Sequence, residues 1–446
     1  MLSFNGISAA ALIAAIAFAS PAGSARAAPD SGSDPELFSL RGQSTFVLQF
    51  HPSFASPYRG ANSLDPAARG EETFDATLFA GARLSGIGEL YADIEADQGF
   101  GLSNTLGVAG YPSGEAYKIG ASTPYFRIPR LFLRRAFGLG GEQEAIALDA
   151  NQLGGSRLSD NIVVTLGKFG VTDIFDTNLY AHDPRQDFLN WAIIDSGAFD
   201  YAADAWGYSY GAAVEWNEDW WTLRLGVFNL SRVPNSRFLQ RDFSQFELVS
   251  EAEARTGIPG RPGKIKFLGF FNRGRMAEYE RAVEAARVLG TAPDTALVRN
   301  YATRPGFALN LEQQIGSDWG AFARVSANDG SKEAYEFTEI NRSVSTGLSF
   351  GGGQWDRPND RLGMAGVVNG ISRSARDYFA AGGLGILIGD GRLTHYNPEE
   401  IFEMYYRLAL ADGFATTLDY QYIVHPAYNA DRGPVAVFGF RVHAEM

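Results

Sequence analysis

The chain has 446 residues and no cysteine, with a formal net charge of −13; 45% of its residues are hydrophobic and 13% are aromatic. This apolar and aromatic content excludes a disordered chain. The lack of cysteine excludes a disulfide framework, a thiolate nucleophile and a Cys-ligated metal site. Because the chain is acidic and has no run of Lys or Arg, we expect no nucleic acid partner.

The N-terminus predicts export. Residues 9–19 are apolar but too few to span a bilayer, and they precede the small-residue pattern Ala25-Arg26-Ala27. This arrangement is typical of a cleaved secretory signal. We therefore predict a signal peptide over residues 1–27, a short periplasmic segment over 28–40 and the main domain over 41–446. No later stretch has the roughly 18 consecutive apolar residues that a transmembrane helix needs.

Alternation with a period of two residues runs through the rest of the chain. In residues 88–97 every even position is apolar and every odd position is polar or amphipathic. Such runs predict about sixteen strands of about ten residues each, long enough for a tilted strand to cross a bilayer. They begin near residues 41, 72, 87, 129, 160, 205, 219, 240, 264, 304, 318, 338, 360, 399, 413 and 434.

The predicted connections alternate between short and long. Turns near residues 84–87, 217–219, 316–318 and 411–413 are very short, whereas the segments near 98–128, 170–204, 276–303 and 371–398 are long. This is typical of an outer-membrane barrel. A soluble β-sandwich or propeller also alternates, but the strand length, the aromatic residues at strand ends and the neutral apolar face favour the membrane. We predict an all-β fold: a transmembrane antiparallel β-barrel of about 16 strands with long loops.

One long connection departs from the β pattern. In residues 275–289 the apolar side chains recur at helical spacing, with Glu and Arg on the remaining faces. We predict a short amphipathic helix that packs on the mouth of the barrel.

The sequence holds no recognisable catalytic motif. None of the five His residues has the i, i+4 spacing of a helical zinc site, and neither a Gly-x-Ser-x-Gly elbow nor a P-loop occurs. We predict no catalytic residue, no metal and no cofactor. An outer-membrane barrel hydrolase stays open as an alternative, and His443 is the strand residue best placed to serve it.

If the apolar faces meet lipid, the opposite faces line the lumen with charges of both signs. Interspersed acids and arginines, with aromatic rings among them, suit a neutral polyhydroxylated solute. We expect Arg83, Asp93, Glu95 and Arg324 to line the pore. The full set on these faces is Asp75, Arg83, Glu89, Asp93, Glu95, Glu215, Arg224, Glu312, Arg324, Glu403, Arg407, Asp419 and Arg441.

The segment 171–205 is too long for a plain hairpin and is dense in Asp, Asn and aromatic residues. It either folds into the barrel and narrows it, or forms an ordered surface loop held by Asx turns. In the first case the candidates for the constriction are Asp173, Asp176, Asn178, Tyr180, His182, Asp183, Arg185, Asn190 and Trp191.

The residues over 167–178 (GKFGVTDIFDTN), 180–185 (YAHDPR) and 188–191 (FLNW) resemble the OprB family of carbohydrate-selective porins. Stretches at 199–204, 320–330 and 419–434 are similar to the family as well. The resemblance implies a sixteen-stranded outer-membrane barrel with inward-folded loops that passes small sugars by diffusion. It also implies that Lys168, Asp173, Asp176, Asn178, Asp183, Arg185 and Trp191 are pore or loop elements.

Together these features predict a carbohydrate-selective porin of the bacterial outer membrane, with no catalytic step. The expected partners are small sugars as permeating solutes, outer-membrane lipid and lipopolysaccharide. A monomer and a homo-oligomer of the chain both stay open. A general pore or a polysaccharide-exporting pore is the alternative within transport.

Overall fold

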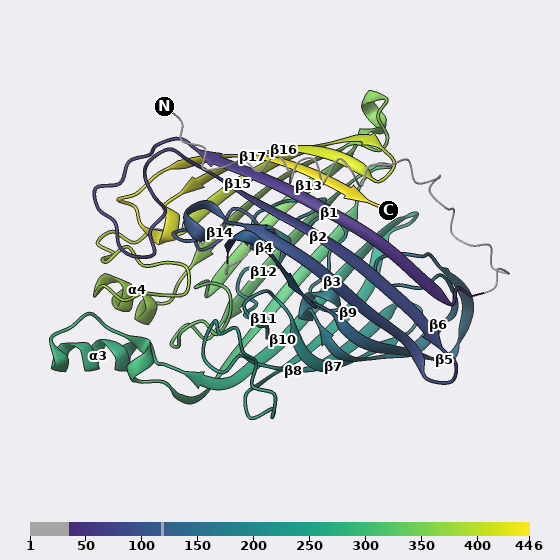
Figure 1. Ribbon diagram of the computed structural model, residues 1–446, viewed down its shortest axis with the longest axis horizontal. Helices are drawn as coiled ribbons and strands as arrows, with labels where there is room; N and C mark the ends of the chain where they lie inside the picture. Colours follow the sequence, from purple (N-terminus) through teal and green to yellow (C-terminus); the bar gives the residue numbers. More distant parts are fainter. Residues whose placement is uncertain (1–34, 117–119) are drawn as a thin grey trace.

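The computed structural model describes residues 35–116 and 120–446, and its strands wrap into a closed barrel (Figure 1). The predicted signal peptide and residues 28–34 lie outside this part of the chain. Among the described residues, no helix is long and apolar enough to cross a membrane.

Within residues 35–116 and 120–446, seventeen strands form one sheet. Their bounds are β1 (Phe38–His51), β2 (Arg69–Leu84), β3 (Gly88–Gly99), β4 (Ala121–Arg127), β5 (Leu131–Ile146), β6 (Gly155–Phe169), β7 (Ser209–Asn217), β8 (Trp221–Asn229), β9 (Phe246–Ile258), β10 (Arg261–Met276), β11 (Asn300–Gln314), β12 (Trp319–Asn328), β13 (Arg342–Gly351), β14 (Arg361–Gly370), β15 (Glu399–Ala411), β16 (Phe414–Val424) and β17 (Val435–Glu445). The helices are α2 (Trp191–Ile194), α3 (Tyr279–Leu289) and α4 (Arg373–Ala380), with short 3₁₀ turns η1 (Leu102–Asn104), η2 (Val171–Asp173), η3 (Thr295–Leu297), η4 (Gly352–Trp355) and η5 (Pro426–Tyr428).

Strands β4 and β5 both pair with β3, so together they occupy one strand position in the wall of the barrel. We call each strand position a stave and the one shared by β4 and β5 the split stave. The seventeen strands therefore make sixteen staves. The break between β4 and β5 contains Pro129, which has no N–H to donate to a neighbouring strand. The strand pairings of this sheet are all antiparallel, and β1 pairs with β17 to close the barrel. The sixteen staves correspond to the sixteen predicted starts, so the predicted fold is confirmed.

The two faces of the wall differ in the way the alternation predicts. On β3, Leu90 and Ile94 are exposed on the outside by 38% and 52%, whereas Asp93 and Glu95 on the inside are at most 1% exposed. A soluble sandwich buries its apolar face and exposes its charges. Here the arrangement is reversed, which fits a barrel whose outer face meets lipid.

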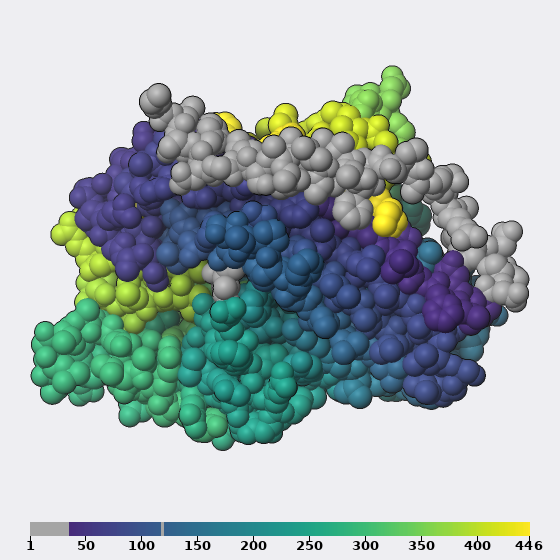
Figure 2. Space-filling view, in the orientation of Figure 1, coloured from purple at the N-terminus to yellow at the C-terminus, as the bar shows by residue number. Residues whose placement is uncertain are grey.

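The connections also separate by length. One end of the barrel carries the long loops 52–68, 100–120, 170–208, 230–245, 277–299, 329–341, 371–398 and 425–434, and the other end carries the shorter turns. We call these the long-loop end and the short-turn end. Loop 277–299 projects beyond the wall at the long-loop end, at the left of the space-filling view (Figure 2).

The predicted loop helix exists, but it begins at Tyr279 rather than Arg275. The prediction starts too early because Arg275 and Met276 still complete β10. Tyr279 packs on Tyr378 of α4 with ring centroids 4.9 Å apart, so α3 and α4 lie side by side at the long-loop end (Figure 1).

Candidate pore constriction

Loop 170–208 folds into the barrel and is anchored to the far wall. Arg324 on β12 is 1% exposed and donates hydrogen bonds of 2.7 Å to the carbonyls of Ile193 and Ala181. Glu403 on β15 accepts a 3.0 Å bond from the backbone N–H of Asn190. Since both anchors are inward-facing wall residues, the loop occupies the lumen rather than the surface.

Further contacts fix the second half of the same loop. The Asp200 carboxylate pairs with Arg304 of β11 and accepts the backbone N–H groups of Tyr335 and Glu336 at 2.9 and 2.8 Å. Ala202 donates its N–H to Glu247 of β9 at 2.9 Å. Contacts from several separate strands hold the loop in one position, so it sets a fixed narrowing of the passage.

A cavity of about 590 Å³ remains between this loop and the wall built from β1 to β6. We call it the constriction cavity. Of the predicted residues, Asp173, His182, Asp183, Arg185 and Trp191 line it. Three arginines that the sequence analysis did not select, Arg127, Arg130 and Arg134, line it from the split stave.

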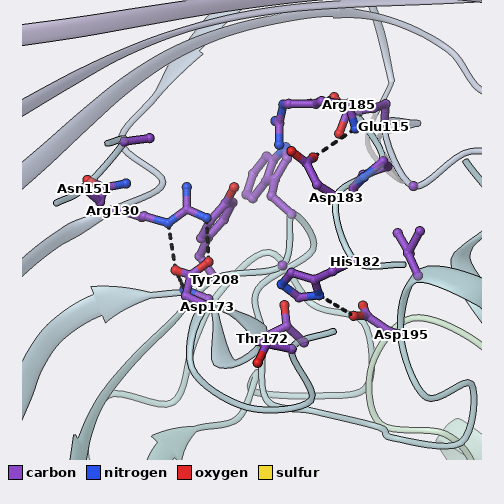
Figure 3. Close-up of a pocket in the computed structure, with 18 of the residues that line it drawn as sticks. Glu115, Arg130, Asn151, Thr172, Asp173, His182, Asp183, Arg185, Asp195 and Tyr208 are labelled. Atoms are coloured by element: carbon purple, nitrogen blue, oxygen red, sulfur yellow. Dashed lines mark hydrogen bonds and ion pairs between the residues drawn. The ribbon is translucent and has the colours of Figure 1, made fainter. Parts of the chain in front are cut away.

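Arg130 connects the split stave to the inward loop. Its guanidinium donates to both carboxylate oxygens of Asp173 at 2.7 and 2.6 Å, and lies 3.3 Å from Asp93 (Figure 3). Burial alone would raise the pKa of Asp173, but the charge of Arg130 and its hydrogen bonds hold that pKa below its ordinary value. Asp173 is therefore ionised in the passage at neutral pH.

Arg127 and Arg185 are held by a set of wall carboxylates. Arg127 pairs with Glu95 and Asp97 and lies 5.1 Å from the ring centroid of Tyr208. Arg185, from the loop, lies 3.4 Å from Glu115 and 3.7 Å from Glu95. The predicted residues Asp93 and Glu95 thus support the cavity by fixing its arginines, without being among the residues that line it.

Stacked aromatic rings form another part of the lining. The rings of Tyr111 and Trp191 stack at 5.1 Å with an interplanar angle of 17°, and Trp191 lies 4.7 Å from Phe337. Tyr201 packs on Phe337 at 4.4 Å. These four rings come from three different loops and give the cavity an aromatic lining beside its charged groups.

Asp176 and Asn178 do not line the constriction cavity. The Asp176 carboxylate accepts bonds from the backbone and hydroxyl of Ser196 and from Asn310, and Asn178 donates to Asn310 at 2.7 Å. Both are buried between the loop and β11, where they anchor the loop. The sequence does not say which side of a loop faces the lumen, so it cannot separate these two residues from those that line the cavity.

Three more predicted residues lie elsewhere. Arg324 is covered by the loop that it anchors, as described above. Lys168 of β6 lies opposite Leu131 of β5 and Tyr210 of β7, and its ammonium lies 3.2 Å from Asp204. Arg83 lies near the short-turn end, 3.0 Å from Glu89, and lines a separate cavity.

The match to known proteins agrees with this geometry. The family model described as "Carbohydrate-selective porin, OprB family" matches residues 61–446. The chain belongs to the OprB family of carbohydrate-selective porins. A search of curated proteins finds no match.

Solved OprB structures share the fold. The high pH structure of Pseudomonas putida OprB matches with a TM-score of 0.70 at 14% identity, covering 92% of this chain and 94% of that one. The low pH structure of the same protein matches with a TM-score of 0.50 at 12% identity, covering 92% and 93%. Membership of the OprB family confirms the predicted outer-membrane location and the sixteen-stranded porin barrel.

The family assignment also decides between channel and hydrolase. OprB proteins are porins, not enzymes, so the family assignment excludes the hydrolase alternative. His443 does have a polar partner, because its Nδ1 lies 3.1 Å from Oγ1 of Thr45. The two residues are opposite each other in the pairing of β17 with β1, so this contact helps to close the barrel. Among the described residues, no cluster of His, Asp and Glu is suited to hold a metal ion.

His182 and Asp195 form a second polar pair in the constriction cavity, with Nδ1 and Oδ1 3.7 Å apart (Figure 3). Burial, reinforced by the charge of Asp176, raises the pKa of Asp195 to about 8. Burial and the charge of Arg324 lower the pKa of His182. At neutral pH the pair is therefore a protonated carboxyl beside a neutral imidazole, which adds hydrogen-bonding groups without net charge.

The arginines of the split stave carry a sequence signal that was overlooked. Arg127 and Arg134 occupy inward positions opposite Glu95 and Glu89 of β3. The alternation is interrupted at residues 128–130, and Pro129 within the run obscures the strand pattern there. Reading the segments on each side of Pro129 separately would have placed both arginines on the inner face.

Proposed function

We propose that small neutral sugars diffuse passively through the constriction cavity. The observation that carries this proposal is the combination, in one cavity, of the Arg130–Asp173 pair with the stacked rings of Trp191 and Tyr111. Guanidinium groups donate to sugar hydroxyls, carboxylates accept from them, and ring faces pack on the C–H surface of a sugar. The volume of about 590 Å³ is within the usual range for a small-molecule site.

In this proposal the contacts with sugar come from Arg130, Asp173, Asp183, Arg185 and Trp191. Positive and negative groups are mixed in the lining, so a neutral solute meets hydrogen-bond partners of both kinds without a barrier from one sign of charge. The anchored loop sets the pore radius. The exposed apolar outer face is the surface on which we expect outer-membrane lipid and lipopolysaccharide to pack.

The test is ion conductance of the refolded protein in a planar bilayer, with a panel of sugars titrated into the bath. We expect block that depends on the concentration of hexoses such as glucose and is weaker for long glucan oligomers. Open channels that are indifferent to every sugar would favour a general pore. Channels that long polysaccharides block most strongly would favour a polysaccharide-exporting pore.

A further inference from the structure

A second cavity, of about 560 Å³, lies at the short-turn end beside the hairpin of β5 and β6. This hairpin projects past its neighbours, because β3 pairs with β5 only up to Glu89 and β7 pairs with β6 only from Asn161. The hairpin lies at the right in Figure 1. The turn between β2 and β3 lines the same cavity, which we call the exit cavity.

The exit cavity continues the passage. Arg134 and Gln152 line both the constriction cavity and the exit cavity, so the two spaces meet at these side chains. The connection 147–154 between β5 and β6 is held at this junction, because Asn151 donates to Asp93 at 3.0 Å and Leu153 donates to the hydroxyl of Tyr91 at 3.0 Å. A solute that leaves the constriction toward the short-turn end therefore enters the exit cavity.

The charge of the lining changes between the two cavities. In the constriction cavity, arginines and carboxylates are mixed. Among the described residues, the exit cavity is lined by four arginines, Arg83, Arg134, Arg135 and Arg157, and by one carboxylate, Glu89. In a chain with a net charge of −13 this is a strong local reversal of sign. A cleft lined by one sign of charge concentrates solutes of the opposite sign.

Most of the contacts that position these arginines leave their charge intact. Arg134 donates to the carbonyl of Asn151 at 2.9 Å, and Arg135 donates to the carbonyl of Gly86 at 2.8 Å. Arg83 donates to the carbonyl of Gly154 at 3.2 Å and pairs with Glu89. A guanidinium has five N–H donors, so each side chain keeps donors for a further acceptor.

Arg157, like Arg135, is exposed. It stands opposite Glu144 in the pairing of β6 with β5, and Glu144 is not among the residues that line the cavity.

We propose that the exit cavity binds the carboxylate of an acidic sugar, so that this porin passes sugar acids as well as neutral sugars. Planar guanidinium groups match the geometry of a carboxylate. The ring of such a solute carries the same hydroxyls that the constriction cavity is equipped to bind. The proposal rests on the proposed function, because the solute must first cross the constriction.

The experiment measures uptake of D-glucuronate and D-glucose, carrying different radiolabels, into the same proteoliposomes of zwitterionic lipid. Glucuronate keeps the glucose ring and adds one carboxylate. The ratio of the two uptake rates does not depend on how much protein is inserted. We compare the unmodified chain with Arg135→Gln/Arg157→Gln, which removes two charges that line only the exit cavity.

Two further variants complete the design. Arg255→Gln/Arg261→Gln removes the same number of charges at the short-turn end, around the turn between β9 and β10 and away from the exit cavity. Arg135→Lys/Arg157→Lys keeps the charge at the exit cavity. We expect the glucuronate-to-glucose uptake ratio to fall about fivefold in Arg135→Gln/Arg157→Gln and in neither of the other two variants, since charge-assisted bonds to the solute are lost only there.

An unchanged ratio in Arg135→Gln/Arg157→Gln, with normal glucose uptake, would overturn the exit site and leave the proposed function standing. An equal fall in Arg255→Gln/Arg261→Gln would also overturn it, because net charge alone would then explain the effect. Absence of glucose uptake by the unmodified chain would overturn the proposed function, and the exit site with it.

Discussion

Arg130 and Asp173 join the wall of the barrel to its inward loop through two hydrogen bonds of 2.6 and 2.7 Å. Arg130 stands in the three-residue break between β4 and β5, and Asp173 ends the 3₁₀ turn η2 at the start of loop 170–208. The break in the strand and the inward loop thus meet at one charged pair, which lies in the constriction cavity.

Replacing Arg130 by Gln should weaken sugar block. The change removes a donor to sugar hydroxyls and leaves Asp173 and Asp93 without their shared cation. We expect the half-blocking glucose concentration to rise about tenfold and the channel to become more cation-selective. Bilayer conductance with glucose titration and a salt gradient measures both. Arg287→Gln, on the exposed face of α3, is the matched control and should behave like the unmodified chain.

Replacing Trp191 by Leu tests the aromatic face. Leu keeps an apolar side chain in the loop but removes the flat ring that stacks on Tyr111. We expect about threefold weaker glucose block with little change in ion selectivity, since no charge is altered. Trp220→Leu is the control, because Trp220 is 63% exposed and lies outside the constriction cavity. Equal effects of the two variants would remove Trp191 from the sugar path.

Replacing Arg324 by Met should release the loop rather than alter a sugar contact. The loss leaves the carbonyls of Ile193 and Ala181 without their donor and Asp176 without its nearby cation at 3.5 Å. Breaking a buried charged contact of this kind costs about 3 kcal/mol. We expect a larger and noisier conductance from a barrel that still folds, together with a lower unfolding midpoint in denaturant. Arg342→Met, on the exposed face of β13, should change neither quantity.

The His182–Asp195 pair predicts a pH effect. Because the pKa of Asp195 is raised from 3.8 to about 8, the folded protein holds this proton over a range where the unfolded chain has lost it. The stability from this group is complete below about pH 4 and is lost as the pH rises through 8. As the pH rises through 8, ionisation of Asp195 adds a negative charge to the passage. We expect cation selectivity, measured by reversal potential, to increase between pH 7 and pH 9, and Asp195→Asn to abolish that increase.

The barrel could be predicted because lipid and lumen impose opposite polarity on alternate residues. Leu90 and Asp93 of β3 follow that rule, and so do the other staves. The strand pairing around Pro129 could not be predicted, since a proline and an irregular segment interrupt the alternation there. The helix predicted over 275–289 ends correctly at Leu289 but starts four residues too early, because the apolar Met276, which fits the helical spacing, belongs to β10.

The constriction was harder to predict. Asp173, Asp183, Arg185 and Trp191 line the constriction cavity, whereas Asp176 in the same loop faces the wall. An irregular loop has no repeating period, so its sequence does not assign sides to its residues. Which aspartate meets the lumen depends on wall partners such as Asn310, which is more than a hundred residues away in the chain.

The most direct test of the central claim is a structure of the protein determined with glucose bound. The account predicts the sugar in the constriction cavity, with its hydroxyls within hydrogen-bond distance of Arg130, Asp173 or Arg185 and a ring face against Trp191. Glucose bound on the opposite side of the inward loop, in the space lined by Leu179, Asp360 and Arg407, would contradict the account.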